Sequence, residues 1–159
     1  MRRIVSQVRA AVDDYNMIQQ GDKIAVGVSG GKDSLLLLRA LCDLKRFYPQ
    51  EFQIVAITVD MRFNKKKGDF SAIQKMCDEL GIEYVVKPTD LYEIIFEVRK
   101  EENPCALCAR MRRGILHDTA KELGCNKIAL GHHLDDAAET FIMNLLLESR
   151  VGCFAPVTY

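Results

Sequence analysis

Residues 23–34 decide the fold, and they read Lys23-Ile24-Ala25-Val26-Gly27-Val28-Ser29-Gly30-Gly31-Lys32-Asp33-Ser34. A short run rich in β-branched residues leads into a pair of glycines, and a helical pattern begins at Lys32. This order is typical of a buried strand that passes through a tight turn into a helix. Glycines let a backbone approach a phosphate closely, and the positive N-terminal end of a helix binds anions. We therefore expect an anion-binding turn here; a tight turn without a ligand is the alternative.

Polar side chains add to this predicted anion site. Ser29 and Ser34 offer hydroxyl donors, and Lys32 offers a positive charge. The turn is not a Walker A loop, because Asp33 follows the lysine and Val26 stands where the earlier glycine is required. It is not a dinucleotide-binding fingerprint either, because no Gly-x-Gly-x-x-Gly occurs. These two phosphate-binding patterns are thereby excluded.

The rest of the chain alternates helical and strand patterns. Apolar spacing predicts helices at 2–20, 32–48, 70–80, 91–99, 105–123 and 134–148. Apolar runs predict strands at 23–28, 53–60, 82–87 and 127–131, with irregular segments at 63–69, 101–104 and 151–159. Four such strands between helices indicate an α/β fold, a Rossmann-like parallel sheet with helices on both faces. Residues 1–20 form a separate N-terminal helix in this scheme.

Three polar segments follow predicted strands. The first is the glycine turn, the second is Asp60, and the third is residues 131–136, Gly-His-His-Leu-Asp-Asp. In parallel sheets the ligand site lies beyond the carboxyl ends of the strands. We therefore expect the three segments to meet at one edge of the sheet.

The composition is that of an ordinary globular protein. Of the 159 residues, 48% are hydrophobic and 28% are charged, which excludes disordered, collagen-like and coiled-coil classes. Lysine and arginine balance aspartate and glutamate at 22 each, so a global polycation is excluded. No apolar run approaches the ~20 residues that a membrane span needs, and the N-terminus lacks an apolar signal region. We expect no membrane association and a cytoplasmic location.

The six cysteines divide into two groups. Cytosolic thiols stay reduced, so clustered cysteines suggest metal, cluster or catalytic roles. Cys105 and Cys108 begin a predicted helix, whose positive end favours thiolates, and arginines follow them. Four interpretations are open: packed thiols, a zinc site lacking a second Cys-x-x-Cys, a redox pair lacking its usual fold, and a three-cysteine iron–sulfur cluster. We expect three of the other cysteines, Cys42, Cys77 and Cys125, to pack in the core. The role of Cys153 is left open.

Two motifs and the cysteine pair resemble a known family. The turn Ser29–Ser34 resembles the PP-loop of the N-type ATP pyrophosphatases, which cleave ATP between the α- and β-phosphates and adenylate a substrate. Residues 131–140, Gly-His-His-Leu-Asp-Asp-Ala-Ala-Glu-Thr, resemble the tRNA-modifying branch. With the cysteines of Asn103-Pro104-Cys105-Ala106-Leu107-Cys108, the chain resembles the tRNA 2-thiocytidine biosynthesis proteins from about Asp22 to its last residue.

This resemblance implies a fold and a set of site residues. Residues 21–159 would form an adenine nucleotide alpha hydrolase-like, PP-loop ATP-binding domain that stops before its last strand. ATP would contact Ser29, Gly30, Gly31, Lys32, Asp33, Ser34, Thr58, Asp60, Gly131 and Asp136, with the backbone around residues 58–61 at the adenine. The catalytic residues would be Lys32, Asp33, Cys105 and Cys108, and the Mg²⁺ ligands Asp135 and Asp136. A [4Fe-4S] cluster would use Cys105, Cys108 and a third cysteine expected beyond Tyr159; Cys153 is misplaced for this role, and a persulfide on Cys105 or Cys108 is the alternative.

Several of these residues have a simpler interpretation. Asp60 could hold a ribose or lie near adenine, but it is equally typical of a turn at a strand end. Asp135 and Asp136 open a helix, where capping explains at least one of them. His132 and His133 could bind a metal, although a structural role is more typical.

The implied activity is ATP-dependent tRNA thiolation. A cytidine of the anticodon loop is adenylated at C2 and its oxygen is replaced by sulfur, with release of AMP and pyrophosphate. A tRNA-lysidine synthetase-like ligase, which needs no cysteine pair, and a nucleotide-binding module without chemistry are the rivals. Clustered positive charges would contact tRNA or form a solvated face: Arg2, Arg3, Lys65, Lys66, Lys67, Arg110, Arg112 and Arg113. Ile4, Val8 and Val12 could pack on the sheet or form a homodimer.

Overall fold

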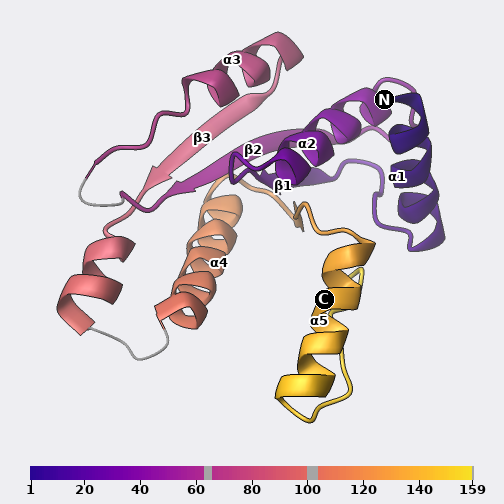
Figure 1. Ribbon diagram of the computed structural model, residues 1–159. Coiled ribbons are helices and arrows are strands. Elements are labelled where there is room, and N and C mark those ends of the chain that lie inside the picture. The colour runs from indigo at the N-terminus through magenta and orange to yellow at the C-terminus, as the bar shows by residue number, and fades with distance from the viewer. Residues whose placement is uncertain (63–65, 100–103, 159) are drawn as a thin grey trace.

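Four parallel strands form the sheet at the centre of the computed structural model, which describes residues 1–62, 66–99 and 104–158 (Figure 1). The strands are β1 (Lys23–Gly27), β2 (Gln53–Asp60), β3 (Glu83–Pro88) and β4 (Lys127–Ala129). Their order is β3-β2-β1-β4, and each neighbouring pair is parallel. The predicted α/β fold with a Rossmann-like parallel sheet is confirmed.

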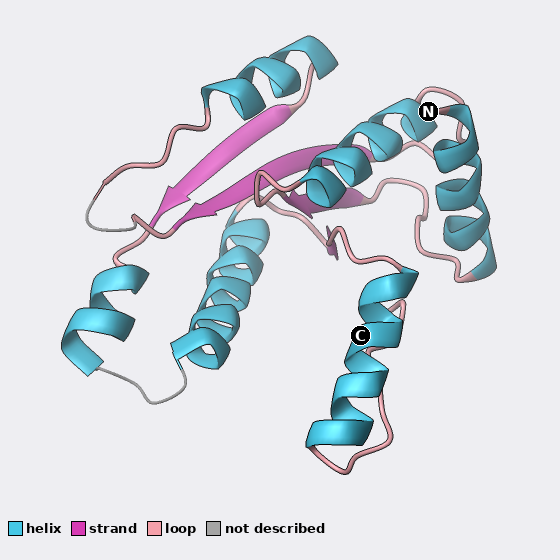
Figure 2. Ribbon diagram, viewed as in Figure 1, coloured by secondary structure: helices cyan, strands magenta, loops and turns pink. Residues whose placement is uncertain are grey.

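Helices cover both faces of this sheet (Figure 2). They are α1 (Arg2–Asp14), α2 (Lys32–Lys45), α3 (Ser71–Leu80), α4 (Pro104–Glu122) and α5 (Leu134–Leu147), with a π-helix, η2, at Glu93–Arg99. Side chains of α1, α2 and α3 share one core cluster with the sheet, and side chains of α4 share another. The predicted coverage of both faces is therefore confirmed.

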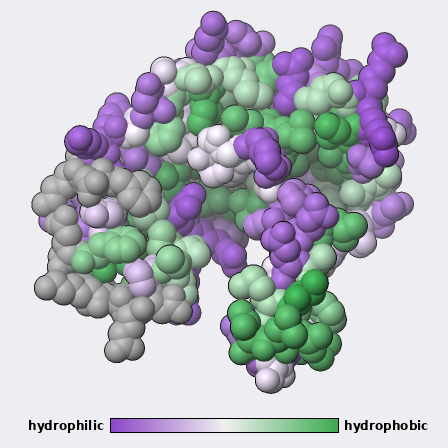
Figure 3. Space-filling view, viewed as in Figure 1, coloured by the Kyte–Doolittle hydropathy of each residue, from purple (hydrophilic) through white to green (hydrophobic). Residues whose placement is uncertain are grey.

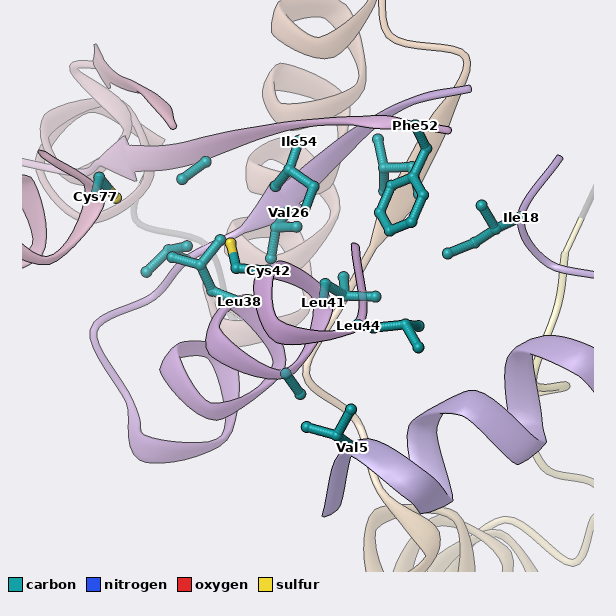
Figure 4. Close-up of a cluster of buried hydrophobic side chains, with 14 of the residues drawn as sticks. Val5, Ile18, Val26, Leu38, Leu41, Cys42, Leu44, Phe52, Ile54 and Cys77 are labelled. Carbon is teal, nitrogen blue, oxygen red and sulfur yellow. The ribbon is translucent and has the colours of Figure 1, made fainter. Parts of the chain in front are cut away.

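Alternation along the strands builds these two cores. Ile24 and Val26 of β1 point into the cluster with α2, whereas Ala25 between them points into the cluster with α4. Leu38 and Leu44 of α2 are fully buried in the first cluster (Figure 4). Because both faces of each strand are covered, the strands read as continuous apolar runs in the sequence.

The first helix is shorter than its apolar spacing predicts. It ends at Asp14, not at residue 20, because Asn16 adopts a left-handed backbone with φ 48° and the N–H of Met17 bonds to the carbonyl oxygen of Val12 at 2.9 Å. Ile18 is still buried, but from the segment that follows the helix. The spacing of three and four residues thus continued past the true helix end.

The other element boundaries agree with the sequence to within a few residues. Pro104 begins α4, a position that suits proline because its missing N–H would have no partner there. Helix α2 ends at Lys45, three residues before the predicted end, and α5 ends at Leu147. The predicted loops 63–69 and 101–104 lie partly outside the described residues, at 63–65 and 101–103.

The apolar face of α1 packs inward. Val5 and Val12 are buried, and Ile4 and Val8 pack against the same core cluster. Of the two interpretations open for Ile4, Val8 and Val12, packing within the chain is therefore confirmed. The homodimer stays a prediction.

Helix α5 differs from the other helices because none of its residues is buried. It extends away from the sheet beside the C-terminal segment, and Figure 3 shows hydrophobic side chains gathered over it. Leu134, Leu146 and Leu147 are between 73% and 82% exposed. Across the described residues, no helix is both long and apolar enough to cross a bilayer.

A buried carboxylate ties the start of β1 to β4. Asp22 is 4% exposed; it accepts hydrogen bonds from the N–H of Gln19 and the amide of Asn126, both at 2.7 Å, and pairs with Lys127 at 2.7 Å. Burial alone would raise the pKa of the Asp22 carboxyl, but the bonds from Lys127, Gln19 and Asn126 outweigh it and hold the pKa below its ordinary value. The ionised form of Asp22 therefore stabilises the fold.

Replacing this carboxylate tests its contribution. We expect Asp22→Asn to lower the free energy of unfolding by about 2–3 kcal/mol, because an amide cannot accept all three bonds. The Asp22 pKa is lower in the folded chain, so its stabilisation is present above the ordinary value of 3.8 and is lost as pH falls through the folded-state pKa. Urea unfolding at pH 7 and at acid pH measures both effects.

The matched control is Asp90→Asn. Asp90 is 68% exposed in a surface ion pair with Arg62 at 3.4 Å, so its removal should change stability by less than about 0.5 kcal/mol. Equal effects of the two substitutions at pH 7 would contradict the role of Asp22.

Candidate functional site

The three polar segments meet at the carboxyl edge of the sheet, as predicted. The turn after β1 contacts the segment after β4, since Gly131 lies against the backbone of Asp33 and Ser34. It also contacts the end of β2, where the hydroxyl of Thr58 donates to the carbonyl oxygen of Val28 at 2.8 Å. The chain leaves β1 towards β2 on one side and returns to β4 on the other, so the meeting point is the topological switch point of the sheet.

Two serines hold the shape of the turn. The hydroxyl of Ser34 accepts from the N–H of Ser29 at 3.2 Å and donates to the carbonyl oxygen of Gly31 at 2.9 Å. The hydroxyl of Ser29 accepts from the N–H of Gly31 at 3.3 Å. Gly30 has φ +85°, a left-handed backbone that strains any other residue. From the sequence, the two hydroxyls were predicted to donate hydrogen bonds to a bound phosphate. In the structure they stabilise the shape of the turn.

The start of α2 is open to an anion. Gly31 is its N-cap residue and no side chain caps it, so the first N–H groups of the helix face the turn without a side-chain partner. Lys32 is 85% exposed, and its ammonium pairs with the Asp33 carboxylate at 3.0 Å. The arrangement can bind a phosphate through backbone N–H groups, the helix dipole and the lysine charge.

Gly131 packs against this same helix end. A Cβ at Gly131 would lie 2.8 Å from the backbone nitrogen of Ser34 and 2.9 Å from the carbonyl carbon of Asp33. Only glycine fits this approach. The resemblance implies an ATP contact at Gly131, and the structure shows that the neighbour of Gly131 is the glycine turn.

The end of β2 supplies braces as well. Thr58 is buried, with Tyr84 donating to its hydroxyl at 2.9 Å. Asp60 is also buried, and its two oxygens accept from the N–H groups of Arg62 at 3.0 Å and Gly68 at 3.2 Å. Of the two interpretations open for Asp60, the turn role is therefore observed for its side chain.

The two aspartates at the start of α5 have different environments. Asp136 accepts from the N–H of His133 at 2.8 Å and completes a capping box. Asp135 is 84% exposed, with an oxygen 3.9 Å from Nδ1 of His133. The ring of His132 lies against Phe154, with centroids 5.2 Å apart. Capping thus accounts for Asp136, and Asp135 is the carboxylate more accessible to a cation.

A cleft of about 470 Å³ opens beside the turn. Its lining includes Ser29 of the turn, Met61 after β2, Lys66 and Lys67 of the segment between β2 and α3, and Arg112 of α4. From the sequence these cations were predicted only as members of a longer set of positive charges, and the cleft that they share was missed. The spacing of four residues between Cys108 and Arg112 would have shown that Arg112 shares a helix face with the cysteine.

Cys108 of the cysteine pair is linked to this cleft through Met61, which lines it. Cys108 is half-buried, with its sulfur 3.4 Å from the Met61 sulfur, and it packs on the buried cluster of Met61, Leu91 and Ile95. Cys105 is exposed. The two thiols therefore stand on the first turns of α4, next to a methionine that lines the cleft. Their donor chemistry fits two ligands of an iron–sulfur cluster, for which thiolates are the proper ligands.

The remaining cysteines are elsewhere. Burial raises the pKa of the Cys77 thiol to about 11, and nearby Cys42 and Asp78 add to the rise. Burial also raises the pKa of Cys42 and Cys125, so these three thiols pack as predicted. Cys153 lies beside α5 in the C-terminal segment, with its sulfur 3.1 Å from the carbonyl oxygen of Ala137. Among the described residues no three Cys, His, Asp or Glu side chains form a metal-binding set, so Cys153 does not join the pair.

Several bacterial proteins are similar to nearly the whole chain. Over 98% of its own length, this chain is 42% identical to the tRNA-cytidine(32) 2-sulfurtransferase of Geobacter sulfurreducens. Over 90% of its own length, it is 46% identical to the enzyme of that name from Pelobacter propionicus. The matches cover 60% and 53% of those relatives, so the chain spans somewhat more than half of their length.

A solved structure and a protein-family model are also similar to most of the chain. The U34-tRNA thiolase NcsA from Methanococcus maripaludis, solved with its [4Fe-4S] cluster, is 30% identical and superposes with a TM-score of 0.75 over 92% of this chain and 50% of that one. The PP-loop domain family matches residues 2–155. From its turn, its sheet edge and these similarities, the chain belongs to the PP-loop domain family.

Proposed function

We propose that this chain carries out ATP-dependent thiolation of tRNA, in which C2 of a cytidine is adenylated and its oxygen is replaced by sulfur. One observation carries the proposal: a single cleft is lined by Ser29 of the anion-binding turn and by Met61, whose sulfur lies 3.4 Å from the sulfur of Cys108. The names of the relatives support cytidine as the base, and the resemblance implies a position in the anticodon loop.

The first step is transfer of the adenylyl group. The C2 carbonyl oxygen of the cytidine attacks the α-phosphorus of ATP, an O–P bond forms, and pyrophosphate leaves with the electrons of the broken P–O bond. Backbone N–H groups at the start of α2, together with Lys32, stabilise the charge that builds on the phosphates. Asp33 holds the Lys32 ammonium at 3.0 Å and so sets its position.

A divalent cation would assist this step. Mg²⁺ takes one or two carboxylates together with phosphate oxygens, and the exposed Asp135 fits that role. Asp136 would join only by giving up its bond to the His133 N–H, so its contribution as a ligand is the smaller. ATP would also contact Gly30, Gly31 and the backbone from Thr58 to Asp60.

The second step replaces the adenylated oxygen with sulfur, and AMP leaves. Cys105, Cys108 and a third thiolate would hold a [4Fe-4S] cluster, which would supply the sulfur for this step. The chain's own contribution is to present both thiols from the start of α4 beside the cleft. A persulfide on Cys108 or Cys105 would attack C2 with its outer sulfur as AMP leaves. The thiolate of the other cysteine would then break the S–S bond to the base, leaving a Cys105–Cys108 disulfide that an external thiol must reduce.

The surroundings of the reaction follow from its substrates. We propose tRNA as the partner and the cytoplasm as the location, because free thiols such as Cys105 and Cys108 persist where the environment is reducing. A homodimer belongs to the same proposal.

Replacing Lys32 tests the first step. We expect Lys32→Ala to lower tRNA-dependent pyrophosphate release about 100-fold or more, because the charge on the transferring phosphates is no longer neutralised. Lys45→Ala, at the other end of α2, is the control and should leave the rate unchanged. An unaltered rate in Lys32→Ala would overturn the phosphate role of the turn.

Replacing the cysteine pair tests the second step. The double variant Cys105→Ser/Cys108→Ser should form no thiolated nucleoside, and it should lack the visible absorption, iron and sulfide found in anaerobically prepared wild-type protein. The control is Cys153→Ser, which removes an exposed thiol outside the pair. This variant should keep the visible absorption, the iron and the sulfide. If the double variant still makes its tRNA product, the chain is a ligase of the lysidine-synthetase kind.

A further inference from the structure

We propose that Lys66, Lys67 and Arg112 form a binding site for a phosphate of the RNA backbone, separate from the nucleotide turn. The proposal rests on the proposed function, since it assigns the substrate's phosphate to a place in that site. The three cations come from segments distant in sequence, the loop after β2 and helix α4, yet they line one cleft. A single nucleotide held between the turn and the cysteines would place its flanking phosphates at this rim.

The cleft is lined by three cationic and two acidic side chains, so its formal charge is +1. Its two acidic residues both accept hydrogen bonds from the backbone: Asp60 from the N–H groups of Arg62 and Gly68, and Asp69 from the N–H of Ser71 at 3.0 Å. None of the three cations forms an ion pair with an acidic side chain in the part of the chain that the structure describes. They are therefore available to an anion that enters the cleft.

The lysines occupy a defined position. Asp60 is 5% exposed and accepts from the N–H of Gly68, the residue that follows Lys67. The backbone of Gly68 lies so close to the ring of Phe70 that a Cβ would be 2.5 Å from it. Lys67 is thus anchored at the adjacent residue, and the loop presents its charges beside the cleft.

Helix geometry distinguishes Arg112 from its neighbours. Cys105, Cys108 and Arg112 are spaced by three and four residues, so they share one face of α4. Arg110 lies on a different face and, like Arg113, does not line the cleft. Arg112 is therefore the one of these three arginines that both lines the cleft and shares a helix face with the thiols.

Two sources of phosphate are chemically alike here, the polyphosphate of ATP and the RNA backbone. The open N-terminus of α2 and Lys32 already serve the polyphosphate at the turn. RNA recognition by a base held out of its stack requires backbone contacts that fix the flanking phosphates. Lys66, Lys67 and Arg112 are suited to contact the phosphates of the RNA backbone.

Equilibrium binding separates the two sources. The probes are a fluorescently labelled tRNA anticodon stem-loop, followed by anisotropy over a range of salt, and Mg-ATP, followed by calorimetry. For Lys66→Ala/Lys67→Ala and for Arg112→Gln we expect RNA affinity to fall about 10-fold or more at ~0.15 M salt. The slope of log affinity against log salt should shrink by about one for each phosphate that is no longer neutralised. Mg-ATP affinity should stay within about twofold of wild type, because its phosphates lie at the turn.

The control is Lys45→Ala/Arg46→Ala, which removes two charges at the far end of α2 and should leave RNA binding unchanged. Weaker ATP binding with RNA binding retained would assign the cations to the polyphosphate and overturn the proposal. So would unchanged RNA affinity, or a weaker affinity without a change in salt slope. Because no turnover is measured, these results stand even if Lys32→Ala disproves the adenylation step.

Discussion

The close packing of Gly131 on the first turn of α2 is the constraint on which the site depends. The Gly131 backbone leaves no space for a side chain beside Ser34 and Asp33, so the ends of β1 and β4 are held together at the switch point of the sheet. This contact fixes where the uncapped end of α2 points. It also places the start of α5, with its exposed Asp135, beside the turn that would hold the phosphates.

The polar groups of the site divide into braces and free groups. Ser34, Thr58, Asp60 and Asp136 make their hydrogen bonds within the protein, on the turn, the β2 end, the basic loop and the α5 cap. The free groups are exposed, and three of them, Lys66, Lys67 and Arg112, line the cleft; the others are Lys32, Cys105 and Asp135. The proposed chemistry falls to the free groups, and the braces hold them in position.

Much of the fold could be predicted because its signals are local. Strands covered on both faces read as apolar runs, and the carboxyl ends of parallel strands must share one edge, so Ser29–Ser34, Asp60 and Gly131 could be brought together from sequence alone. The end of α1 could not, since the apolar spacing continues to Ile18 while the left-handed Asn16 ends the helix.

The tertiary roles of single polar residues were equally hidden. Asp22 meets Asn126 across 104 residues of sequence, and Arg112 lines one cleft with the lysine loop. Neither arrangement produces a periodic pattern in the sequence from which it could be predicted. Asp60 and Asp136 could be recognised as turn or cap residues by type, but only the bonds to Gly68 and His133 show that they act as such.

The central claim is that the turn after β1 binds the phosphates of ATP, and the most direct test is a crystal structure with Mg²⁺ and a non-hydrolysable ATP analogue. We predict phosphates within hydrogen-bond distance of the N–H groups at the start of α2, with the adenosine against the backbone of residues 58–61. A nucleotide bound at another place, or a turn that stays empty at saturating concentration, would contradict the claim.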